Sequence, residues 1–456
     1  MPVRIRRKSR LGGLLALFVT IVALIAVSQP ASAGTPAVLT PDPGSMSFGN
    51  VRVGTLMIDI LSIQNTGGSS ITLHSANNAG GAVNDFAGAT GIDPSTFSPD
   101  SDFDCLKAPD GVSDRVLAPG NTCAFIIITL PTGAGPRNTT FELRDSADTV
   151  RLEVPLSVNG TEGYYISGAL GEVAHFGDAK PYGDATTINL NAPIVDIQQV
   201  PFGEGFWLLG LDGGVFSYPT DDSQDAHFLG STGGMNLNAP VVSMSPRSSD
   251  GYYLAGLDGG VFNYGPDAPF HGSMGGQDLN APVIGISVNP QRDGYWLAGT
   301  DGGVFAFEDA GFHGSRGGQP LNAPIVGMAP TPTGDGYWLV GEDGGVFNYG
   351  DAGFFGSMGG MKLNAPIVDF APSPTGFGYW MLGLDGGVFA FGDAAFQGNL
   401  LGNNNATGIT GTAPPLAFPL DGTYFSVNEV AGGPIVAQRK TFVSKASKAP
   451  RARRSR

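Results

Sequence analysis

Short apolar runs separated by turn residues recur along the second half of this chain. In one clear stretch the runs cover residues 324–329, 337–341, 346–349 and 353–356. Asp343-Gly344-Gly345 stands between the second and third runs, and Asp-Gly favours a tight hairpin in which both central residues adopt positive φ. Apolar residues show no helical spacing in the stretch, so the pattern predicts four antiparallel β-strands.

This unit repeats about every 42 residues, and its Asp-Gly-Gly turn begins at Asp212, Asp258, Asp301, Asp343 and Asp385. Degenerate copies occur around Gly171 and Gly432. Four-stranded units repeated around a ring are the blades of a β-propeller, which we expect over residues 161–438. Seven hairpin copies favour seven blades. The partial copies at the two ends would give six blades if they combined into one closing blade.

Residues 34–160 differ in composition and contain no copy of the repeat. Their apolar runs, such as 58–63, 124–130 and 151–158, are short and separated by Gly, Asn, Asp and Pro. Short strands of this kind over roughly 120 residues predict an immunoglobulin-like β-sandwich. The predicted fold class is therefore all-β, with an Ig-like β-sandwich followed by a β-propeller.

Both regions resemble modules of bacterial proteins. The phrases Gly-Tyr-Trp-Leu, Asp-Gly-Gly-Val-Phe and Leu-Asn-Ala-Pro-Ile-Val resemble a repeat of secreted actinobacterial proteins, in which it looks like an accessory propeller attached to varied partners, including cell-wall and other hydrolases. The first region resembles the choice-of-anchor D modules, relatives of the ASPM-SPD2-Hydin Ig-like domain, at Phe48-Gly49, Asn65-Thr66-Gly67, Leu117-Ala118-Pro119-Gly120 and Val158-Asn159-Gly160. Thr129-Leu130-Pro131 departs from the usual Phe-x-Pro of those modules. Neither resemblance specifies a ligand.

The N-terminus predicts export. Five basic residues between Arg4 and Arg10 precede an apolar run over residues 11–27, and Ala31-Ser32-Ala33 fits a signal-peptide cleavage site. We therefore expect residues 1–33 to be a cleaved signal peptide, with the mature protein secreted or at the cell surface. A retained N-terminal membrane anchor is the alternative, because the apolar run is close to the lower limit for crossing a bilayer.

Cys105 and Cys123 are the two cysteines of the chain. An oxidising compartment outside the cell would let them pair. Unpaired thiols or a redox site are the alternatives, but there is no Cys-x-x-Cys spacing and no nearby basic cluster to lower a thiol pKa. We expect a structural disulfide.

Charge is unevenly distributed along the chain. Residues 34–438 contain 11 basic and 40 acidic residues, a net charge of −29. This acidic body disfavours nucleic acid as a partner. Residues 439–456 contain eight basic residues and no acidic one, which predicts a disordered basic tail suited to an anionic wall polymer or membrane surface. A simple solvated end is the plainer alternative.

No group of residues predicts a catalytic site, a cofactor or a metal ion. His271 and His313 are the two histidines at equivalent repeat positions, and two imidazoles are a weak ligand set. The repeated aspartates of the turns and of the next loop have Gly or apolar neighbours instead of further oxygen ligands, so we expect them to accept hydrogen bonds in turns. The insertion over residues 221–225, with three carboxylates, is the exception in which calcium would fit better.

Each repeat carries two adjacent aromatic residues, such as Tyr337-Trp338. Neighbouring strand residues point to opposite faces, so we expect one ring against each adjacent blade, with sugar binding as the alternative. Recognition is expected at positions that differ between copies. In the loops before Leu-Asn-Ala-Pro and in the inner-strand turns these are Met235, Asn236, Arg247, Gln277, Asp278, Arg292, Gln319, Met361 and Lys362.

Together these patterns predict an exported, non-enzymatic binding or adhesion protein whose propeller recognises a cell-wall polysaccharide or an extracellular protein. The alternative is a glycan hydrolase or lyase with its active site in the central funnel, because paired carboxylates from different blades need no linear motif. Charged or tyrosine side chains outside the turns, converging at one end of the channel, would favour the enzyme. We expect no cofactor.

Overall fold

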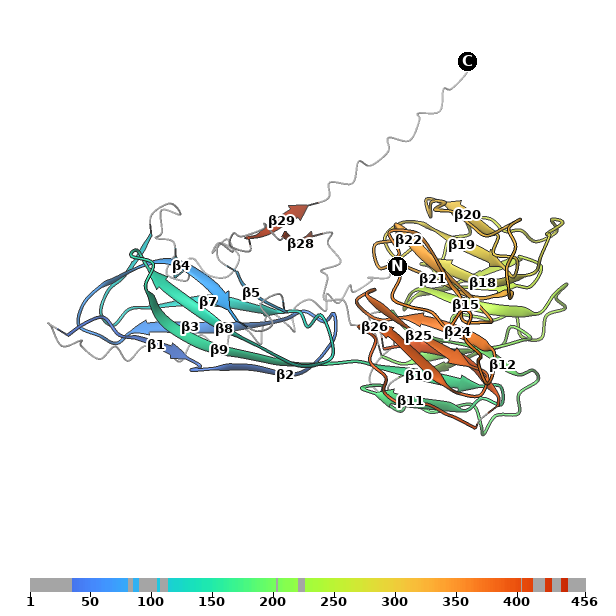
Figure 1. Cartoon of the computed structure of the whole chain (residues 1–456), viewed down its shortest axis with the longest axis horizontal. Helices are drawn as coiled ribbons and strands as arrows, with labels where there is room; N and C mark the ends of the chain where they lie inside the picture. Colours follow the sequence, from blue (N-terminus) through green and yellow to red (C-terminus); the bar gives the residue numbers. More distant parts are fainter. Residues whose placement is uncertain are drawn as a thin grey trace, which may run out of the picture.

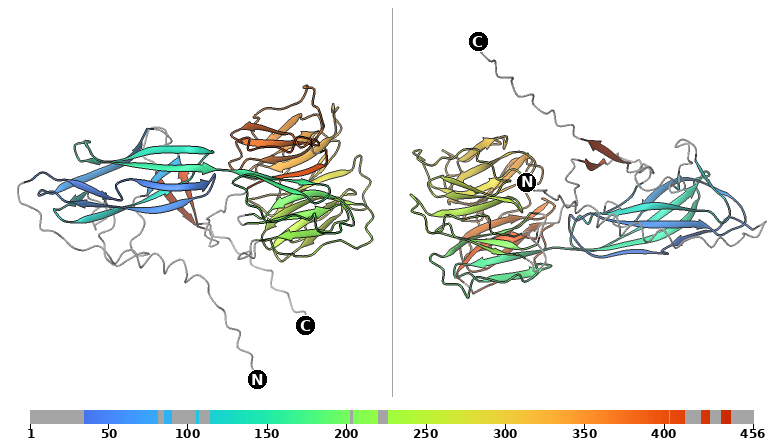
Figure 2. Two further views of the ribbon diagram at one scale, coloured as in Figure 1. Left: turned by 90° about the horizontal axis from the view of Figure 1, so that it is seen from below. Right: turned by 180° about the vertical axis from the view of Figure 1, so that it is seen from behind.

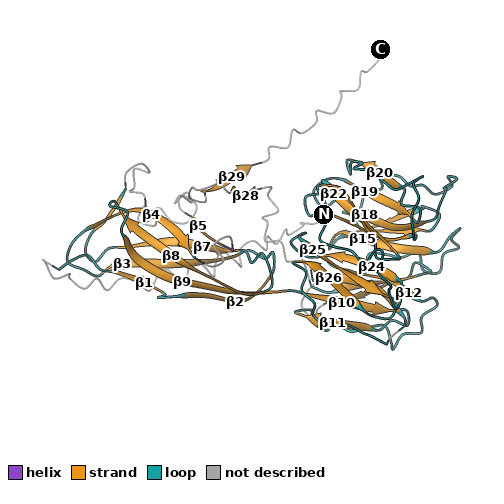
Figure 3. Ribbon diagram, viewed as in Figure 1, coloured by secondary structure: helices purple, strands orange, loops and turns teal. Residues whose placement is uncertain are grey.

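The computed structural model describes residues 35–80, 85–89, 105–106, 114–201, 204–219, 226–402, 404–412, 423–428 and 436–441. Within these residues every element is a β-strand (Figure 3), so the all-β prediction is confirmed. No helix in the described part of the chain is long and apolar enough to cross a membrane. The expected signal peptide over residues 1–33 lies outside the described residues, as does the acidic insertion over residues 221–225.

The N-terminal strands form two sheets. The first has the order β1-β3-β7-β5 and the second β2-β9-β8-β4-β6. Neighbours are antiparallel except β2 and β9, which pair in parallel. The bounds are Leu39–Asp42 (β1), Met46–Arg52 (β2), Met57–Asn65 (β3), Ile71–Ala79 (β4), Phe86–Ala89 (β5), Arg115–Leu117 (β6), Thr122–Thr129 (β7), Gly135–Asp145 (β8) and Val150–Thr161 (β9).

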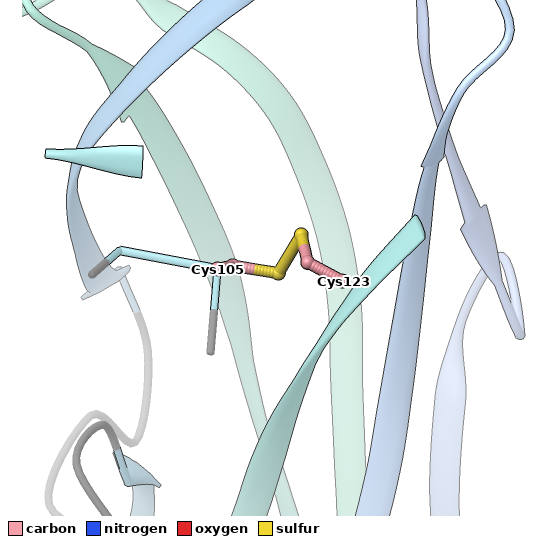
Figure 4. Close-up of a disulfide and its surroundings, with 2 residues drawn as sticks. All are labelled: Cys105 and Cys123. Carbon is pink, nitrogen blue, oxygen red and sulfur yellow. A yellow bond between two sulfur atoms is a disulfide. The ribbon is translucent and has the colours of Figure 1, made fainter. Parts of the chain in front are cut away.

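These two sheets enclose one hydrophobic core. Along β9 buried and accessible residues alternate, because successive side chains of a strand point to opposite faces. The rings of Phe125 from β7 and Phe141 from β8 lie 4.9 Å apart between the sheets. Cys105 and Cys123 are also buried in this core and form a disulfide, with Cα atoms 5.0 Å apart (Figure 4). The structure therefore contains the expected disulfide.

The remaining strands form six three-stranded sheets, each antiparallel, and one separate hairpin (Figure 1). The inner strands are β12 (Ile194–Gln199), β15 (Val241–Ser248), β18 (Val283–Val288), β21 (Ile325–Pro330), β24 (Ile367–Pro372) and β27 (Ala406–Gly411). They contact one another in a closed cycle in this order, which makes the six sheets a propeller-like ring. The middle strands are β10 (Gly163–Gly168), β13 (Phe206–Gly210), β16 (Gly251–Gly256), β19 (Gly294–Gly299), β22 (Gly336–Gly341) and β25 (Gly378–Gly383), and the outer strands are β11 (Val173–Gly177), β14 (Val215–Tyr218), β17 (Val261–Tyr264), β20 (Val304–Glu308), β23 (Val346–Gly350) and β26 (Val388–Gly392).

The expected seventh sheet does not form part of this ring. Strand β27, near the end of the array, pairs with β10 at its start, so the first and last copies share one sheet. The aromatic side chains of these two ends are already in contact, with Tyr164 and Trp380 ring centroids 5.3 Å apart. The Tyr424 hairpin instead forms a separate two-stranded sheet, β28 (Thr423–Asn428) with β29 (Val436–Thr441). Strand β29 also includes the first residues of the expected basic tail.

The expected fourth strand of each unit is absent from the described sheets. In the unit of β21–β23, residues 353–356 follow the outer strand but do not pair with it. The backbone amide of Phe355 donates instead to the Tyr379 hydroxyl of the next sheet, at 3.2 Å. These residues therefore bridge two sheets, and their hydrogen bonds are not available for a fourth strand.

The repeated aromatic pairs lie between neighbouring sheets. Tyr337 contacts Trp296 of the preceding sheet at 5.4 Å between centroids, and Trp338 contacts Tyr379 of the following sheet at 6.1 Å. The other four boundaries hold Trp207 with Tyr252, Tyr253 with Tyr295, Trp380 with Tyr164 and Tyr165 with Phe206. All twelve side chains are at most 1% exposed. The prediction of a core between blades is confirmed.

The Asp-Gly-Gly turns also have the expected structural role, with a different geometry. Asp343 accepts a hydrogen bond from the amide of Gly345 at 3.0 Å, and the other four copies repeat this bond. Gly344 has φ +74°, whereas Asp343 does not adopt positive φ. The amide of Gly344 bonds to the Gly341 carbonyl and the Gly341 amide to Gly345, so the loop is a bulged hairpin in which only the glycine is left-handed.

Candidate functional site

The inner strands of the ring surround a cavity of about 540 Å³, and residues from all six of them line it. The pairing register shifts near the start of five inner strands, for example between Ile194 and Asp196 of β12. A bulge of this kind lets two consecutive residues face the same side, and both Val195 and Asp196 line the cavity. The equivalents of Asp196 in the other copies are Ser243, Gly285, Gly327, Asp369 and Gly408.

Asp196 and Asp369 bring two carboxylates into this cavity. Asp196 is 7% exposed and accepts hydrogen bonds from the Met244 amide at 2.8 Å and the Gln198 side chain at 3.0 Å. Asp369 accepts a bond from the Ile409 amide at 2.7 Å. In both cases the amide belongs to the next inner strand, so each carboxylate links two neighbouring sheets.

A neutral side chain makes the same link elsewhere in the ring. The Ser243 hydroxyl, at the equivalent position, accepts a bond from the Ile286 amide at 3.3 Å. Glycine occupies the remaining positions and makes no such link. The hydrogen bonds that Asp196, Asp369 and Ser243 accept therefore hold neighbouring inner strands of the ring together.

Burial raises the pKa of both carboxyls, and the negative charge of Asp196 raises the pKa of Asp369 further. A carboxyl with a raised pKa can act as a proton donor near neutrality. These two side chains do meet part of the condition that favours an enzyme, because they lie outside the turns and face the channel. They lie near the start of β12 and β24, beside the apolar Val195 and Val368.

This pair was not expected from the sequence. Its signal was visible as Asp at two copies of a position that holds Ser or Gly in the others. Repeat comparison alone did not reveal that the position faces the ring axis, because the bulge reverses the side that simple strand alternation would assign to it.

The residues expected for recognition divide between the two ends of the ring. We call the end with the Asp-Gly-Gly turns of Asp212, Asp258, Asp301, Asp343 and Asp385 the hairpin end. The loops that carry Met235, Asn236, Gln277, Asp278, Gln319, Met361 and Lys362 are tied to these turns by backbone bonds, such as Met358 to Gly344, and all seven side chains are exposed. Gln319 accepts a bond from Arg316 at 2.6 Å; within the described residues the other six make no side-chain hydrogen bond.

Arg247 and Arg292 lie at the opposite end, Arg247 in the last residues of inner strand β15 and Arg292 in the turn that follows β18. Arg247 forms an ion pair with Asp293 of the next sheet at 2.7 Å, and Arg292 pairs with Asp335 of the sheet after that. Arg247 also donates to the backbone carbonyls of Asn289 and Arg292. Both arginines therefore link neighbouring sheets, and the structure does not bring them together with the hairpin-end loops.

The two-sheet unit meets the ring at this same opposite end. Strand β9 continues into β10 through Glu162 alone (Figure 2), and Glu162 is 3% exposed. Its carboxylate accepts a bond from the Ala395 amide. Asp178, after β11, accepts bonds from Arg52, Thr161 and Thr412 at 3.1, 3.0 and 2.8 Å. We call the end that contains Glu162 and Asp178 the junction end.

Burial raises the pKa of Glu162 to about 7. The hydrogen bond from the Ala395 amide opposes this rise, and the nearby carboxylates of Asp393 and Asp178 reinforce it. The junction therefore contains an acidic group whose charge changes near neutral pH.

The other candidate groups are structural in the described residues. Asp351 accepts bonds from Thr331 and Thr333, and Asp393 from Ser373 and Thr375, so these loop aspartates hold the turn between inner and middle strands. The equivalent histidines pack on aromatic rings, with His313 5.6 Å from Tyr337. Among the described residues no group of three or more His, Cys, Asp or Glu side chains could hold a metal ion.

Comparison with known proteins finds similarity among solved structures. No protein-family model matches the chain, and no curated protein matches it. Of 557 matching chains of solved structure, one is the β-propeller domain of Cps50 (Swd1) from Myceliophteria thermophila. It is 12% identical, with a TM-score of 0.33, and the match covers 43% of this chain and 64% of that one, less than two thirds of its length.

Proposed function

We propose that this chain is an exported binding protein whose ring recognises a cell-wall polysaccharide or an extracellular protein through its hairpin end. The observation that carries this proposal is the difference between side chains that are engaged in packing or hydrogen bonds and side chains that are exposed without such contacts. The paired aromatic residues of the middle strands and the turn aspartates are occupied in packing and hydrogen bonds, whereas six of the seven variable side chains at the hairpin end are exposed and unbonded within the described residues. A rigid scaffold that presents loops of differing chemistry is suited to recognition.

The arrangement of the chain supports the same proposal. The two-sheet unit joins the ring at the junction end. The loops of the hairpin end are therefore on the side of the ring that faces away from the two-sheet unit. We infer that the two-sheet unit is an Ig-like module that positions the ring, that residues 1–33 direct export, and that the ring is a six-bladed propeller. The basic tail would add electrostatic contact with an anionic wall polymer or membrane surface.

This proposal is tested with the mature chain, residues 34–456, on an array of wall polysaccharides and extracellular proteins. The test variant combines Met235→Ser, Met361→Ser and Lys362→Ser at the hairpin end. The control is Met57→Ser, because Met57 is 41% exposed on the two-sheet unit. Loss of binding in the triple variant alone supports the proposal, and equal binding by both variants contradicts it.

A second candidate is a glycan hydrolase or lyase that uses Asp196 and Asp369. The observation that favours it is the pair of carboxyls with raised pKa in the channel. The same array, analysed for released sugar products, distinguishes the two functions. Turnover that Asp369→Asn abolishes would establish the enzyme, and binding without product leaves the first proposal in place.

A further inference from the structure

Five phenylalanines occupy the same position of five different repeats and remain exposed. They are Phe228, Phe270, Phe312, Phe354 and Phe396, and their exposed fractions are 59%, 56%, 61%, 59% and 55%. Each follows the outer strand of its sheet, on the segment that crosses to the next sheet. None of the five lines the central cavity. Single exposed apolar residues are common in soluble proteins, but a fivefold repetition at one position is not explained by chance exposure.

The positions directly before and after the phenylalanine do not share this repetition. The residues before it are His227, Pro269, Gly311, Gly353 and Ala395, and those after it are Leu229, His271, His313, Phe355 and Gln397. Both flanking positions therefore vary, whereas the exposed position between them is constant in five copies. Packing does not explain this constancy, since more than half of each side chain is open to solvent.

The backbone on both sides of each phenylalanine is fixed by the buried aromatic residues. Before Phe354, the Gly353 carbonyl accepts a bond from the Trp338 indole at 2.6 Å; after it, the Phe355 amide donates to the Tyr379 hydroxyl at 3.2 Å. The other four copies repeat both bonds, with Tyr253 in place of tryptophan before Phe270. Each exposed ring is thus presented from a fixed backbone, which lowers the conformational cost of binding.

The sixth sheet differs at this position. It has Pro181 instead of phenylalanine, although the Tyr165 hydroxyl still donates to the preceding Lys180 carbonyl at 3.0 Å. This is the sheet of β10 and β11, which the two-sheet unit joins through Glu162 and the Arg52–Asp178 bond. The exposed aromatic is therefore missing from the one sheet that is covalently joined to the other half of the protein.

We propose that these five phenylalanines form a multivalent binding surface for an uncharged polysaccharide. The apolar C–H face of a sugar ring matches the face of one aromatic side chain. A stable protein interface instead needs roughly 800 Å² on each partner, and the residues directly beside each phenylalanine differ from copy to copy. The net charge of −29 over residues 34–438 disfavours an anionic polymer.

The repeated spacing of the sites suits a polymer. One exposed phenylalanine side chain binds a sugar weakly. Five such side chains on one rigid six-sheet ring can together engage several sugar units of a chain or network. This inference shares the exported location and ligand class with the proposed function. It does not depend on the hairpin-end loops, and it places the contact on the outside of the ring.

The test is co-sedimentation of the mature chain with insoluble cellulose and chitin, with soluble carboxymethyl-cellulose as the anionic polymer in an affinity gel. Variants replace all five phenylalanines by serine or by tyrosine, and Phe354 alone by serine. We expect retention on at least one neutral polymer. The single serine variant should bind about twofold to threefold more weakly and the five-serine variant more than about tenfold, because multivalent contacts reinforce one another. The five-tyrosine variant should bind as the unchanged protein does.

Thermal unfolding of each variant shows whether it remains folded, and the five-tyrosine protein serves as the second measure if the five-serine protein does not. Retention on neither neutral polymer, stronger retention on carboxymethyl-cellulose, or unchanged binding by the five-serine variant would overturn the inference. A dimer or larger assembly in light scattering, together with no polymer binding, would also overturn the inference. The five phenylalanines would then contact a second copy of the chain. Loss of polymer binding only in the Met235/Met361/Lys362 variant would support the hairpin-end proposal and overturn this one.

Discussion

The two-sheet unit and the ring are both built from strands but distribute their cores differently. In the two-sheet unit, 17 buried residues form a single cluster that includes the disulfide. In the ring the core is divided into six clusters of seven to nine buried residues, one for each boundary between sheets. Stability of the ring therefore comes from contacts between nearest neighbours, as in other repeat architectures.

This difference explains where variation can occur. A substitution in the core of the two-sheet unit alters the packing of both of its sheets. A substitution in the core of the ring alters the packing at one boundary between sheets. The exposed positions of the loops and outer segments, such as Met361 and Phe354, make none of the ring contacts of the tyrosines and tryptophans, although the backbone on either side of Phe354 bonds to Trp338 and Tyr379. They can vary, or carry an exposed aromatic, without disturbing the fold.

The largest effect is expected at a boundary of the ring. Trp338→Ala removes a fully buried side chain and its bond to Gly353, and should lower the free energy of unfolding of the ring by about 3 to 5 kcal/mol. Denaturant unfolding followed by fluorescence measures this. The control Phe354→Ala alters a side chain that is 59% exposed and should change the free energy of unfolding by less than about 0.5 kcal/mol. Equal effects of the two substitutions would contradict the division between buried and presented aromatics.

The next effect concerns the two-sheet unit alone. Replacing Cys105 and Cys123 by serine removes a cross-link between residues 18 apart and should destabilise that unit by about 3 kcal/mol. The unfolding transition of the ring should not move, since its clusters contain neither cysteine. Calorimetry that resolves two transitions tests this. An equal shift of both transitions would mean that the two regions unfold as one.

The smallest expected effect is on the pH dependence of stability, and it arises at Glu162, which connects the two regions. Its folded-state pKa is raised from 4.5 to about 7, so stability that is fully present below pH 4.5 is lost as the pH rises through 7. The loss should be about 2 to 3 kcal/mol. Glu162→Gln should flatten this dependence between pH 5 and 8 in thermal unfolding, while the exposed control Glu308→Gln leaves it unchanged. The same slope in both variants would exclude Glu162 as the group responsible.

The sequence predicted the parts of the fold that depend on local residue order. The strands of each unit, the aromatic boundary pairs and the turn role of Asp343 all follow from which residue types recur at which spacing. Ring closure does not, because pairing of β27 with β10 joins residues about 240 apart, such as Ser167 and Gly408. The predicted fourth strand fails for a related reason, since tyrosine hydroxyls of the next sheet compete for its amides.

The candidate sites were harder to predict, because the type of a residue does not determine whether its side chain is exposed. Phe354 and Phe355 are adjacent in one apolar run, yet Phe354 is 59% exposed and Phe355 packs against Trp338 and Tyr379. Likewise, Asp196 and Asp343 are both repeat aspartates, one facing the channel and one closing a turn. Only the three-dimensional arrangement separates them.

The most direct test of the account compares the hairpin end with the channel in one experiment. Binding of the mature chain to its strongest array ligand is measured by calorimetry, with product analysis of the same samples, for the unchanged protein, the Met235/Met361/Lys362 triple variant and Asp369→Asn. We predict that the triple variant loses binding, that Asp369→Asn keeps it and that no product appears. Full binding by the triple variant, or product formation that Asp369→Asn abolishes, would contradict recognition at the hairpin end.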